Sequence, residues 1–499
     1  MPKNVPTLYY SVVRQIYRIA AIALLGLLFA INVYRAATQS VTHDEALTYE
    51  LFVGAPWSIV FNSFDANHHV LHTIICKVFV DLMGVSTLSL RMASLLGGLL
   101  YFFVIFRICE RLLGASWYML LGIALLTLNP YMLDFLSAAR GYGMAVALFL
   151  LAFWEMLCWM TDPKSLHMIR AGVALGLSVA ANLVFAPPSI GLALMFLIAV
   201  VNQRAAFQPE VTISKKGKKK EEPNPYPTVS QALLRFFLLF VATAWLILMY
   251  PISNAVSEQF YVGAQSLSQA SESLVHESLP LAPMLVIATL AFVVLPALLA
   301  TSAFLGWRAA SRWVKASLSE KSLMLLGGTM LIAFLSFVVG HMTTNVPYPE
   351  GRTGLYWIPL LTLSGLIIAQ LYERATALLA IPMAACVALF LAEFRVDYYA
   401  DWPYDSETKT LVEQIRSHKP NVDNRKLTVA GSWQLEPSLN FYRVSDHLDW
   451  MAEVERGEPK SGADLYVLLS QDSRFVDQLH LKTIYKGSRS GTILAEPSS

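Results

Sequence analysis

Charged residues are scarce in this chain. Only 14% of its 499 residues are Asp, Glu, Lys or Arg, whereas 56% are hydrophobic. Soluble domains carry about 25% charged residues, so this composition excludes an ordinary soluble protein. Long uncharged runs recur along the sequence, and such runs are typical of transmembrane helices. We therefore expect an α-helical protein that crosses a membrane several times.

Cysteine is also rare. The four cysteines, at positions 76, 109, 158 and 386, lie in or beside apolar segments at unrelated spacings. This pattern excludes a disulfide framework and a cysteine metal motif, and it favours small core residues. The formal net charge is +2, which predicts no nucleic-acid partner. The placement of the basic residues carries more information than their sum.

The N-terminal segment lacks a convincing signal-peptide cleavage site. Lys3, Arg14 and Arg18 lie ahead of or at the start of an apolar run over residues 19–33. Positive residues favour the cytoplasmic side, so this first span is expected to be a retained helix that runs outward from a cytoplasmic N-terminus.

Basic and non-basic loops alternate along the rest of the chain. The segment 203–228, which contains the run KKGKKKEE, reads as a solvated, disordered cytoplasmic linker. With ~20 residues needed to cross the hydrocarbon, about eleven spans result, and every strong basic cluster falls on one side. The tail is then external. Expected spans cover residues 19–33, 88–106, 112–133, 144–160, 168–185, 189–201, 232–250, 283–305, 323–339, 354–371 and 377–391.

One apolar segment does not fit as a span. Between residues 69 and 84, polar or small residues recur at helical spacing on one face and apolar residues fill the other. This pattern predicts an interfacial helix in the first external loop. A span here would reverse every later loop and place the basic clusters outside.

The residues after about 395 change character and predict a small external α/β domain. We expect domains at 1–394 and 395–499, the second within the usual domain size range. The tail holds no glycine-rich phosphate loop and no nucleophile elbow, so its sequence predicts no catalytic function for it. Helices are expected over residues 406–418, 438–443 and 473–479, strands over 426–430 and 464–469, and a hairpin over 483–494.

On this topology four polar segments meet on the external face. They are the loop around His43-Asp44-Glu45-Ala46 with the helix start NHHVLH, the turn NPYMLDFLSAARGYG, the loop over residues 251–280, and the segment HMTTNVPYPEGRTGLYWIP. Span interiors are almost free of ionisable groups, and Glu155 is the nearest exception. An ion-coupled transporter needs such groups near the midplane, so that class is disfavoured.

Five short motifs carry a resemblance to a known family. HDEALTYE, NHHVLHT, SLRMAS, AARGYG and GRTGLYWIP, in that order and with common sidedness, resemble bacterial polyprenyl-phosphate-dependent glycosyltransferases of the GT-C superfamily. The pattern is most similar to glycosyltransferase family 39, which includes protein O-mannosyltransferases, the lipid A aminoarabinose transferase and rhizobial core transferases. Where that family often has an acidic residue or Lys followed by Pro, this chain has His68-His69-Val70.

The resemblance implies a GT-C fold and an inverting transferase in the bacterial inner membrane. It maps the catalytic base to Asp44 and the lipid-phosphate site to Arg352 and Tyr356. The donor would be a sugar on a polyprenyl phosphate, and the acceptor an envelope glycan, glycolipid or protein. A base on the acceptor hydroxyl typically contributes ~10²–10⁴-fold, while the leaving phosphate needs cations such as Arg352 or Arg140 rather than a general acid.

Further candidates come from the same external segments. Glu45 is assigned to the catalytic pair in an orienting role, and His69 to the donor phosphate. A divalent metal held by His43, His68 and His341 is an alternative to surface histidines without a ligand. The expected substrate-lining residues are His43, Asn67, His68, Asp134 and Tyr142.

Simpler interpretations stay open. Asp44 and Glu45 could cap the helix that follows them, and Arg91, Arg140 and Arg352 could anchor helix ends at the headgroups. The aromatic residues Tyr142, Tyr261, Tyr356 and Trp357 could belong to interfacial belts. Three function classes therefore remain: a lipid-linked glycosyltransferase, which we favour, a lipid or glycan flippase or transporter, and a non-enzymatic scaffold for envelope assembly.

Overall fold

The computed structural model describes residues 7–207, 211–213, 219–221, 224–256, 259, 262–419 and 425–498. Predictions that concern Lys3, Tyr261 and residues 208–210, 214–218 and 222–223 of the linker lie outside the described residues.

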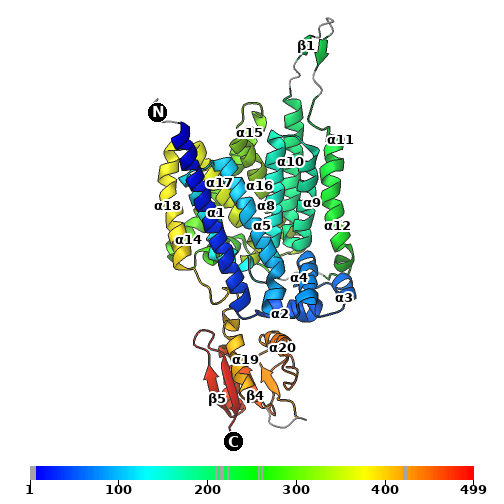
Figure 1. Cartoon of the computed structure of the whole chain (residues 1–499), viewed down its shortest axis with the longest axis vertical. Coiled ribbons are helices and arrows are strands. Elements are labelled where there is room, and N and C mark those ends of the chain that lie inside the picture. The colour runs from blue at the N-terminus through cyan, green and yellow to red at the C-terminus, as the bar shows by residue number, and fades with distance from the viewer. Residues whose placement is uncertain are drawn as a thin grey trace.

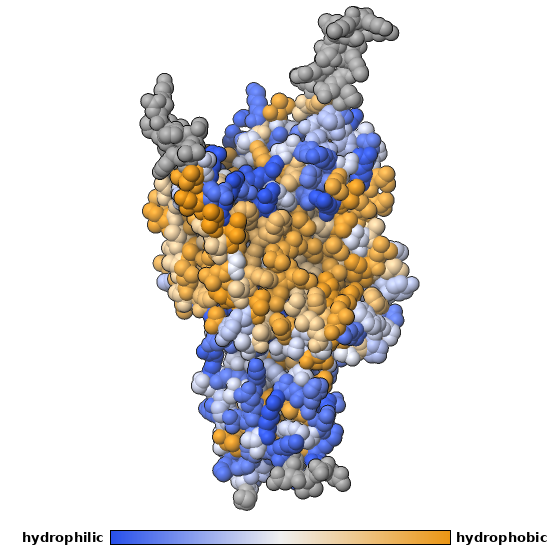
Figure 2. Space-filling model, viewed as in Figure 1, coloured by the Kyte–Doolittle hydropathy of each residue, from blue (hydrophilic) through white to orange (hydrophobic). Residues whose placement is uncertain are grey.

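Apolar helices run side by side along most of the molecule (Figure 1). Their outer surface forms a hydrophobic belt between two hydrophilic ends (Figure 2). Within the described residues, seven helical segments are long and apolar enough to cross a membrane, and four apolar helices are shorter. Together they correspond to the eleven predicted spans, and the chain is a multi-pass membrane protein.

The long segments are α1 (Thr7–Thr38), α5 (Thr87–Leu113), α8 (Gly141–Thr161), α10 (Ala186–Ala205), α12 (Leu238–Ser253), α15 (Leu295–Ser311) and α16 (Leu318–Thr344), three of which continue short helical turns before them. The shorter apolar helices are α6 (Trp117–Thr127), α9 (Ser165–Ala181), α17 (Trp357–Leu371) and α18 (Glu373–Ala392). The connecting helices are α11 (Val229–Ala232), α13 (Leu267–Ser278) and α14 (Met284–Thr289).

The span predicted over residues 112–133 differs in its bounds. Helix α5 continues to Leu113, α6 begins after the cap Ser116, and a separate helix α7 covers Pro130–Phe135. Asn129 caps α7 by accepting a hydrogen bond from the Met132 backbone N–H at 3.0 Å. An Asn-Pro pair ends one helix and starts the next, because proline is favoured in the first helical turn.

Most of the loop that follows α1 is helical. It contains α2 (His43–Thr48), a π-helical turn at Tyr49–Val53, α3 (Trp57–Asn62) and α4 (Val70–Met83). Helix α4 has 14 residues and belongs neither to the seven candidate spans nor to the four shorter apolar helices. The helix predicted over residues 69–84 is therefore confirmed as a short helix outside the set of candidate spans.

The linker contains two short strands. Strands β1 (Val211–Ile213) and β2 (Lys219–Glu221) pair antiparallel, where the sequence predicted only a disordered segment. This pair lies beyond the same end of the bundle as the start of α1 (Figure 1).

The C-terminal part contains a four-stranded sheet of order β3-β4-β6-β5, with β3 and β4 parallel and the other pairs antiparallel. Each predicted helix, strand and hairpin of this region has an observed counterpart. The elements are α19 (Thr408–Arg416), β3 (Val429–Gly431), α20 (Glu436–Ser445), β4 (Leu465–Leu468), α21 (Arg474–Gln478), β5 (Leu481–Lys486) and β6 (Ile493–Pro497).

This C-terminal part lies at the opposite end of the molecule from the start of α1 (Figure 1). It contacts the first loop directly. The Val41 backbone N–H donates to the Tyr442 hydroxyl at 3.0 Å, and the His43 backbone N–H donates to Asp405 Oδ2 at 2.6 Å. Helix α2 is thus held between the bundle and the C-terminal sheet.

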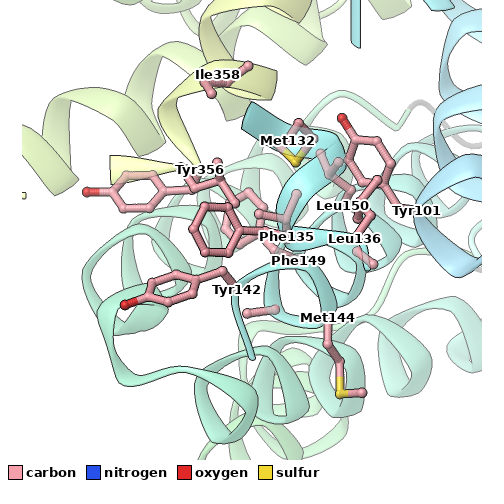
Figure 3. Packing of buried hydrophobic residues seen from close by; sticks show 14 of the residues in the cluster. Tyr101, Met132, Phe135, Leu136, Tyr142, Met144, Phe149, Leu150, Tyr356 and Ile358 are labelled. Atoms are coloured by element: carbon pink, nitrogen blue, oxygen red, sulfur yellow. The ribbon is translucent and has the colours of Figure 1, made fainter. Parts of the chain in front are cut away.

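Buried aromatic and aliphatic side chains, among them Phe135, Tyr142 and Tyr356, pack together in one cluster (Figure 3). Phe135 packs edge-to-face against Tyr142, with 5.2 Å between ring centroids. Tyr356 packs against Phe185 in the same way, at 5.5 Å. Such pairs contribute about 0.5–1.5 kcal/mol beyond the area they bury.

Candidate active site

A polar cavity of about 730 Å³ lies where the first loop meets the C-terminal part. Its walls come from the loops at one end of the bundle and from two residues of the C-terminal part, Trp433 and Arg456. Of the residues predicted from sequence, the cavity brings together His43, Asp44, Asn67, His68, His69, Arg140, Tyr142 and Arg352.

Asp44 faces two arginines in this cavity. Its Oδ2 lies 2.9 Å from Arg352 Nη1 and 3.7 Å from Arg140 Nη2. The helix that carries Asp44 starts at the cap Thr42. This cap and the contact with Asp405 fix the backbone of α2, so the Asp44 side chain projects toward arginines from distant parts of the chain.

Asp44 stays ionised in this environment. Burial acts to raise the pKa of the Asp44 carboxyl, but the positive charges of Arg352 and Arg140 outweigh it and leave the pKa below its usual value. Burial acts to lower the pKa of Arg352, and attraction to Asp44 raises it overall. A deprotonated carboxylate is the state that a general base requires.

A hydrogen-bond network holds Arg140 in place. Its Nη1 donates to the Asn67 side-chain oxygen and, at 3.3 Å, to the Thr48 hydroxyl. Asn67 Nδ2 in turn donates to the Asp44 carbonyl oxygen and to the Thr48 hydroxyl, both at 2.9 Å. Because α2 supplies two of these groups, the network ties Arg140 to the backbone beside the candidate base.

Two histidines line the cavity in their neutral form. Burial lowers the pKa of His68 to about 4 and that of His69 well below its usual value. His68 stacks on Phe52 at 3.9 Å between centroids, and His69 packs edge-to-face with Tyr142 at 5.0 Å. A neutral imidazole can bond a hydroxyl or a phosphate oxygen without adding charge.

Arg352 also has partners in the segment that follows α18. Its Nη1 lies 3.8 Å from Asp401 Oδ2, and its guanidinium lies over the Trp402 ring, 5.5 Å from the centroid. Burial raises the pKa of Asp401 to about 7, although Arg352 acts against this rise. Asp401 also accepts a hydrogen bond from the Tyr131 hydroxyl at 3.4 Å.

Glu45 does not line the cavity. It is fully buried, and both of its oxygens accept hydrogen bonds from Arg91 at 2.7 Å, with further bonds from the backbone N–H groups of Thr42 and Ala139. Its capping interaction with Thr42 matches the helix-cap interpretation. Arg91 is fully buried, so the headgroup-anchor interpretation is wrong for this arginine.

Three other predicted residues lie elsewhere. Tyr356 is fully buried in the aromatic cluster, because its ring turns into the core ahead of α17. Asp134 forms ion pairs with Arg35 and Arg395. His341, near the end of α16, packs on Tyr348 and pairs with the Val346 carbonyl oxygen. None of the three lines the cavity. Donor-phosphate binding by Tyr356 and substrate lining by Asp134 therefore stay predictions.

The described residues gather no group of three or more His, Cys, Asp or Glu side chains that could hold a metal ion. The alternative with His43, His68 and His341 as ligands is not formed, since His341 lies outside the cavity.

The residues that sequence reasoning missed at this site include Asp401, Trp402, Trp433 and Arg456. Trp433 follows the parallel strand β3 and precedes α20. The position of Trp433 just after a parallel strand is the signal that could have found it, because ligands of α/β folds bind beyond the carboxyl ends of parallel strands. The other three depend on how the C-terminal part docks, which no local pattern reveals.

A second, apolar cavity of about 520 Å³ adjoins the first. The two share the lining residues Phe337 and Pro349, close to Arg352. The apolar cavity is bounded mainly by side chains of α13, α15, α16 and α17. The charged cluster of the polar cavity therefore lies beside a hydrophobic space large enough for part of a hydrocarbon chain.

No family model matches the sequence, and no curated protein matches it. Solved structures do resemble it at low identity. ArnT from Cupriavidus metallidurans bound to undecaprenyl phosphate gives a TM-score of 0.44 at 14% identity, covering 96% of this chain and 97% of its own. Arabinosyltransferase EmbB from Mycobacterium smegmatis gives 0.39 at 11%, covering 74% of this chain and 31% of its own.

A third similar structure is the oligosaccharyltransferase AglB from Archaeoglobus fulgidus in complex with an inhibitory peptide and a dolichol phosphate. Its TM-score is 0.42 at 13% identity, and the match covers 85% of this chain and 63% of its own.

Proposed function

We propose that this protein is an inverting glycosyltransferase that moves a sugar from a polyprenyl-phosphate donor to an acceptor hydroxyl at the external face of a bacterial inner membrane. One observation carries the proposal. The ionised Asp44 faces Arg352 at 2.9 Å and Arg140 at 3.7 Å in a polar cavity that adjoins an apolar one. This arrangement offers a base, two cations for a phosphate and a hydrophobic space for a lipid.

The donor would place its phosphate beside Arg352 and its first isoprene units in the apolar cavity. Phosphate oxygens suit guanidinium groups, which present a planar fork of donors. The cation set is preorganised, because Arg140 is held by Asn67 and Thr48, and Arg352 by Asp401 and Trp402. Fixed charges that need no rearrangement stabilise developing charge efficiently.

The acceptor would present its hydroxyl to Asp44. The hydroxyl oxygen attacks the anomeric carbon while the bond from that carbon to the phosphate oxygen breaks. The hydroxyl proton moves to Asp44, and the polyprenyl phosphate departs with the bonding pair against the arginines. A single displacement of this kind inverts the configuration at the anomeric carbon.

We expect Asp44→Asn to abolish most transfer while donor binding persists. The amide keeps the shape of the carboxylate but cannot take the proton, and loss of a general base typically costs ~10²–10⁴-fold. The assay uses purified full-length protein in detergent with a panel of radiolabelled polyprenyl-phosphate sugars, and donor binding is measured in parallel.

Asp81→Asn is the matched control. Asp81 belongs to the same external loop but is exposed and pairs with Lys77 at 3.5 Å. Its variant should transfer sugar like the parent protein. Parental turnover in Asp44→Asn would refute the base assignment. A parent that binds every donor and transfers none would instead favour the flippase or the scaffold.

A further inference from the structure

Part of the wall of the polar cavity comes from the C-terminal part. Trp433 lies in the turn between β3 and α20, and 46% of its surface is exposed. The Arg456 guanidinium lies over the Trp433 ring, 5.0 Å from the centroid, and 47% of the Arg456 side chain is exposed. Both residues line the cavity.

This wall is joined to the candidate base through one residue. The His43 ring meets the Trp433 ring edge-on, with 5.8 Å between centroids. His43 Nδ1 pairs with the Gln434 carbonyl oxygen at 2.6 Å, while the His43 backbone N–H bonds Asp405. Asp44 follows His43 directly, so the indole and the carboxylate are set at a fixed separation.

The two ends of the cavity differ in chemistry. Near Arg352, the cavity shares Phe337 and Pro349 with the apolar cavity, which suits a lipid. At the other end, an exposed indole is surrounded by planar polar groups: the Arg456 guanidinium and the His43 imidazole. A sugar ring has a face of C–H groups and a rim of hydroxyls, so an indole beside planar polar groups complements both.

We propose that Trp433 and Arg456 form an acceptor subsite that binds a saccharide, so that the acceptor is the sugar portion of a glycan or glycolipid rather than a protein. This inference rests on the proposed function, because it assigns the second substrate of the same cavity. Glu436 orients the Arg456 side chain, since the buried Glu436 carboxylate accepts a hydrogen bond from Arg456 at 3.2 Å.

The chain offers a matched control within the same part. Arg474 lies over the Phe475 ring at 4.9 Å and pairs with Glu458 at 3.4 Å, repeating the arrangement of Arg456 away from the cavity. Arg456→Gln and Arg474→Gln therefore remove the same kind of interaction at two places. Trp433→Phe keeps an aromatic face, whereas Trp433→Ala removes it.

The experiment measures two ligands on each purified full-length variant. One probe is a panel of oligosaccharides followed by saturation-transfer NMR, and the other is a polyprenyl phosphate followed by direct binding. We expect Trp433→Ala to weaken saccharide binding at least tenfold, Trp433→Phe and Arg456→Gln to weaken it less, and Arg474→Gln to leave it unchanged. Polyprenyl-phosphate binding should stay at the parental level in all four, which also reports that they fold.

Three results would overturn the subsite. They are saccharide binding that survives Trp433→Ala, a parent that binds no oligosaccharide of the panel, or a peptide panel that binds in a Trp433-dependent way in place of sugars. Failure of the proposed function looks different. Saccharides would then bind through Trp433, but no donor sugar would be transferred to them.

Discussion

At the scale of single residues, Arg352 joins the candidate base to the segment that follows α18. It lies against Asp44, Asp401 and the Trp402 ring, and only about a quarter of its side chain is exposed. A cation in such a place is strongly desolvated, so an anionic ligand that reaches it gains more than it would at an open surface.

We expect Arg352→Ala to weaken the binding of polyprenyl phosphate by roughly 2–5 kcal/mol, the usual cost of truncating one partner of a buried charge pair. Arg352→Lys should restore only part of this affinity, because an ammonium lacks the planar fork that grips two phosphate oxygens. Binding of a radiolabelled polyprenyl phosphate to the purified variants measures both effects.

Arg308→Ala is the control for loss of an arginine. Arg308 is exposed near the end of α15, where it lies over the Phe304 ring. Its variant should bind the lipid phosphate like the parent. If Arg352→Ala also binds at the parental level, then Arg352 only anchors its turn at the headgroups.

The residues of the site divide into those that a local pattern reveals and those that it does not. Asp44, Arg140 and Arg352 could be predicted, since each is a charged residue in one of the polar segments between the apolar runs. Tyr356 could not, because the direction of its ring depends on the packing ahead of α17. Trp433 was missed, because its neighbour Gln434 meets His43 across 391 residues of sequence.

At the scale of elements, the start of α8 is the most confined helix end at the site. A Cβ atom on Gly141 would lie 2.2 Å from the Ala181 carbonyl oxygen and 2.7 Å from His69 Cβ. The absence of a side chain therefore lets α8 begin against the end of α9 and the start of α4. This contact sets the positions of Arg140 and His69, both of which line the cavity.

We expect Gly141→Ala to lower the melting temperature and to weaken donor binding. The added methyl group meets backbone that cannot move aside, and overpacking of this kind typically costs about 1–3 kcal/mol. Thermal unfolding in detergent and lipid-phosphate binding measure the two effects. Gly340→Ala serves as control, because a Cβ there would meet nothing within 4 Å.

The two glycine variants are expected to differ in melting temperature. Gly340 lies inside α16, where alanine is a better helix former than glycine, so its variant should keep or raise the melting temperature. Equal behaviour of the two variants would show that the start of α8 tolerates a side chain.

Elements were predicted well where one physical rule decides them. Hydrophobic length gave the spans, and a helical alternation of polar and apolar residues gave α4. The rule failed over residues 112–133, because an uncharged run does not show where Asn129 and Pro130 divide it. The strand pair in the linker was also missed, since lysine-rich sequence carries no strand signal.

At the scale of the whole molecule, the start of α1 and the C-terminal part lie at opposite ends of the bundle (Figure 1). Reporter fusions after Lys219 and Arg312 should report the cytoplasm, whereas fusions after Ser271 and at the C-terminus should report the external side. The physical reason is the preference of Lys and Arg for cytoplasmic loops. Fusions to alkaline phosphatase and to a fluorescent protein report the side of the membrane at each position independently.

A cytoplasmic C-terminus would contradict the proposed function. The cavity would then face the cytoplasm, because Trp433 and Arg456 belong to both the cavity wall and the C-terminal part. A membrane-flipped donor could not be the substrate of such a site.

The contact between Asp44 and Arg352 sets the order of events at this site. While the two are paired at 2.9 Å, the carboxylate is a poor proton acceptor, because its negative charge is already neutralised. A phosphate competes for Arg352 and leaves the carboxylate more basic. We therefore expect an ordered sequence, in which the lipid donor binds before the acceptor is deprotonated. Without a phosphate at Arg352 the carboxylate stays paired, so the base gains strength only when the bond to be broken is in place.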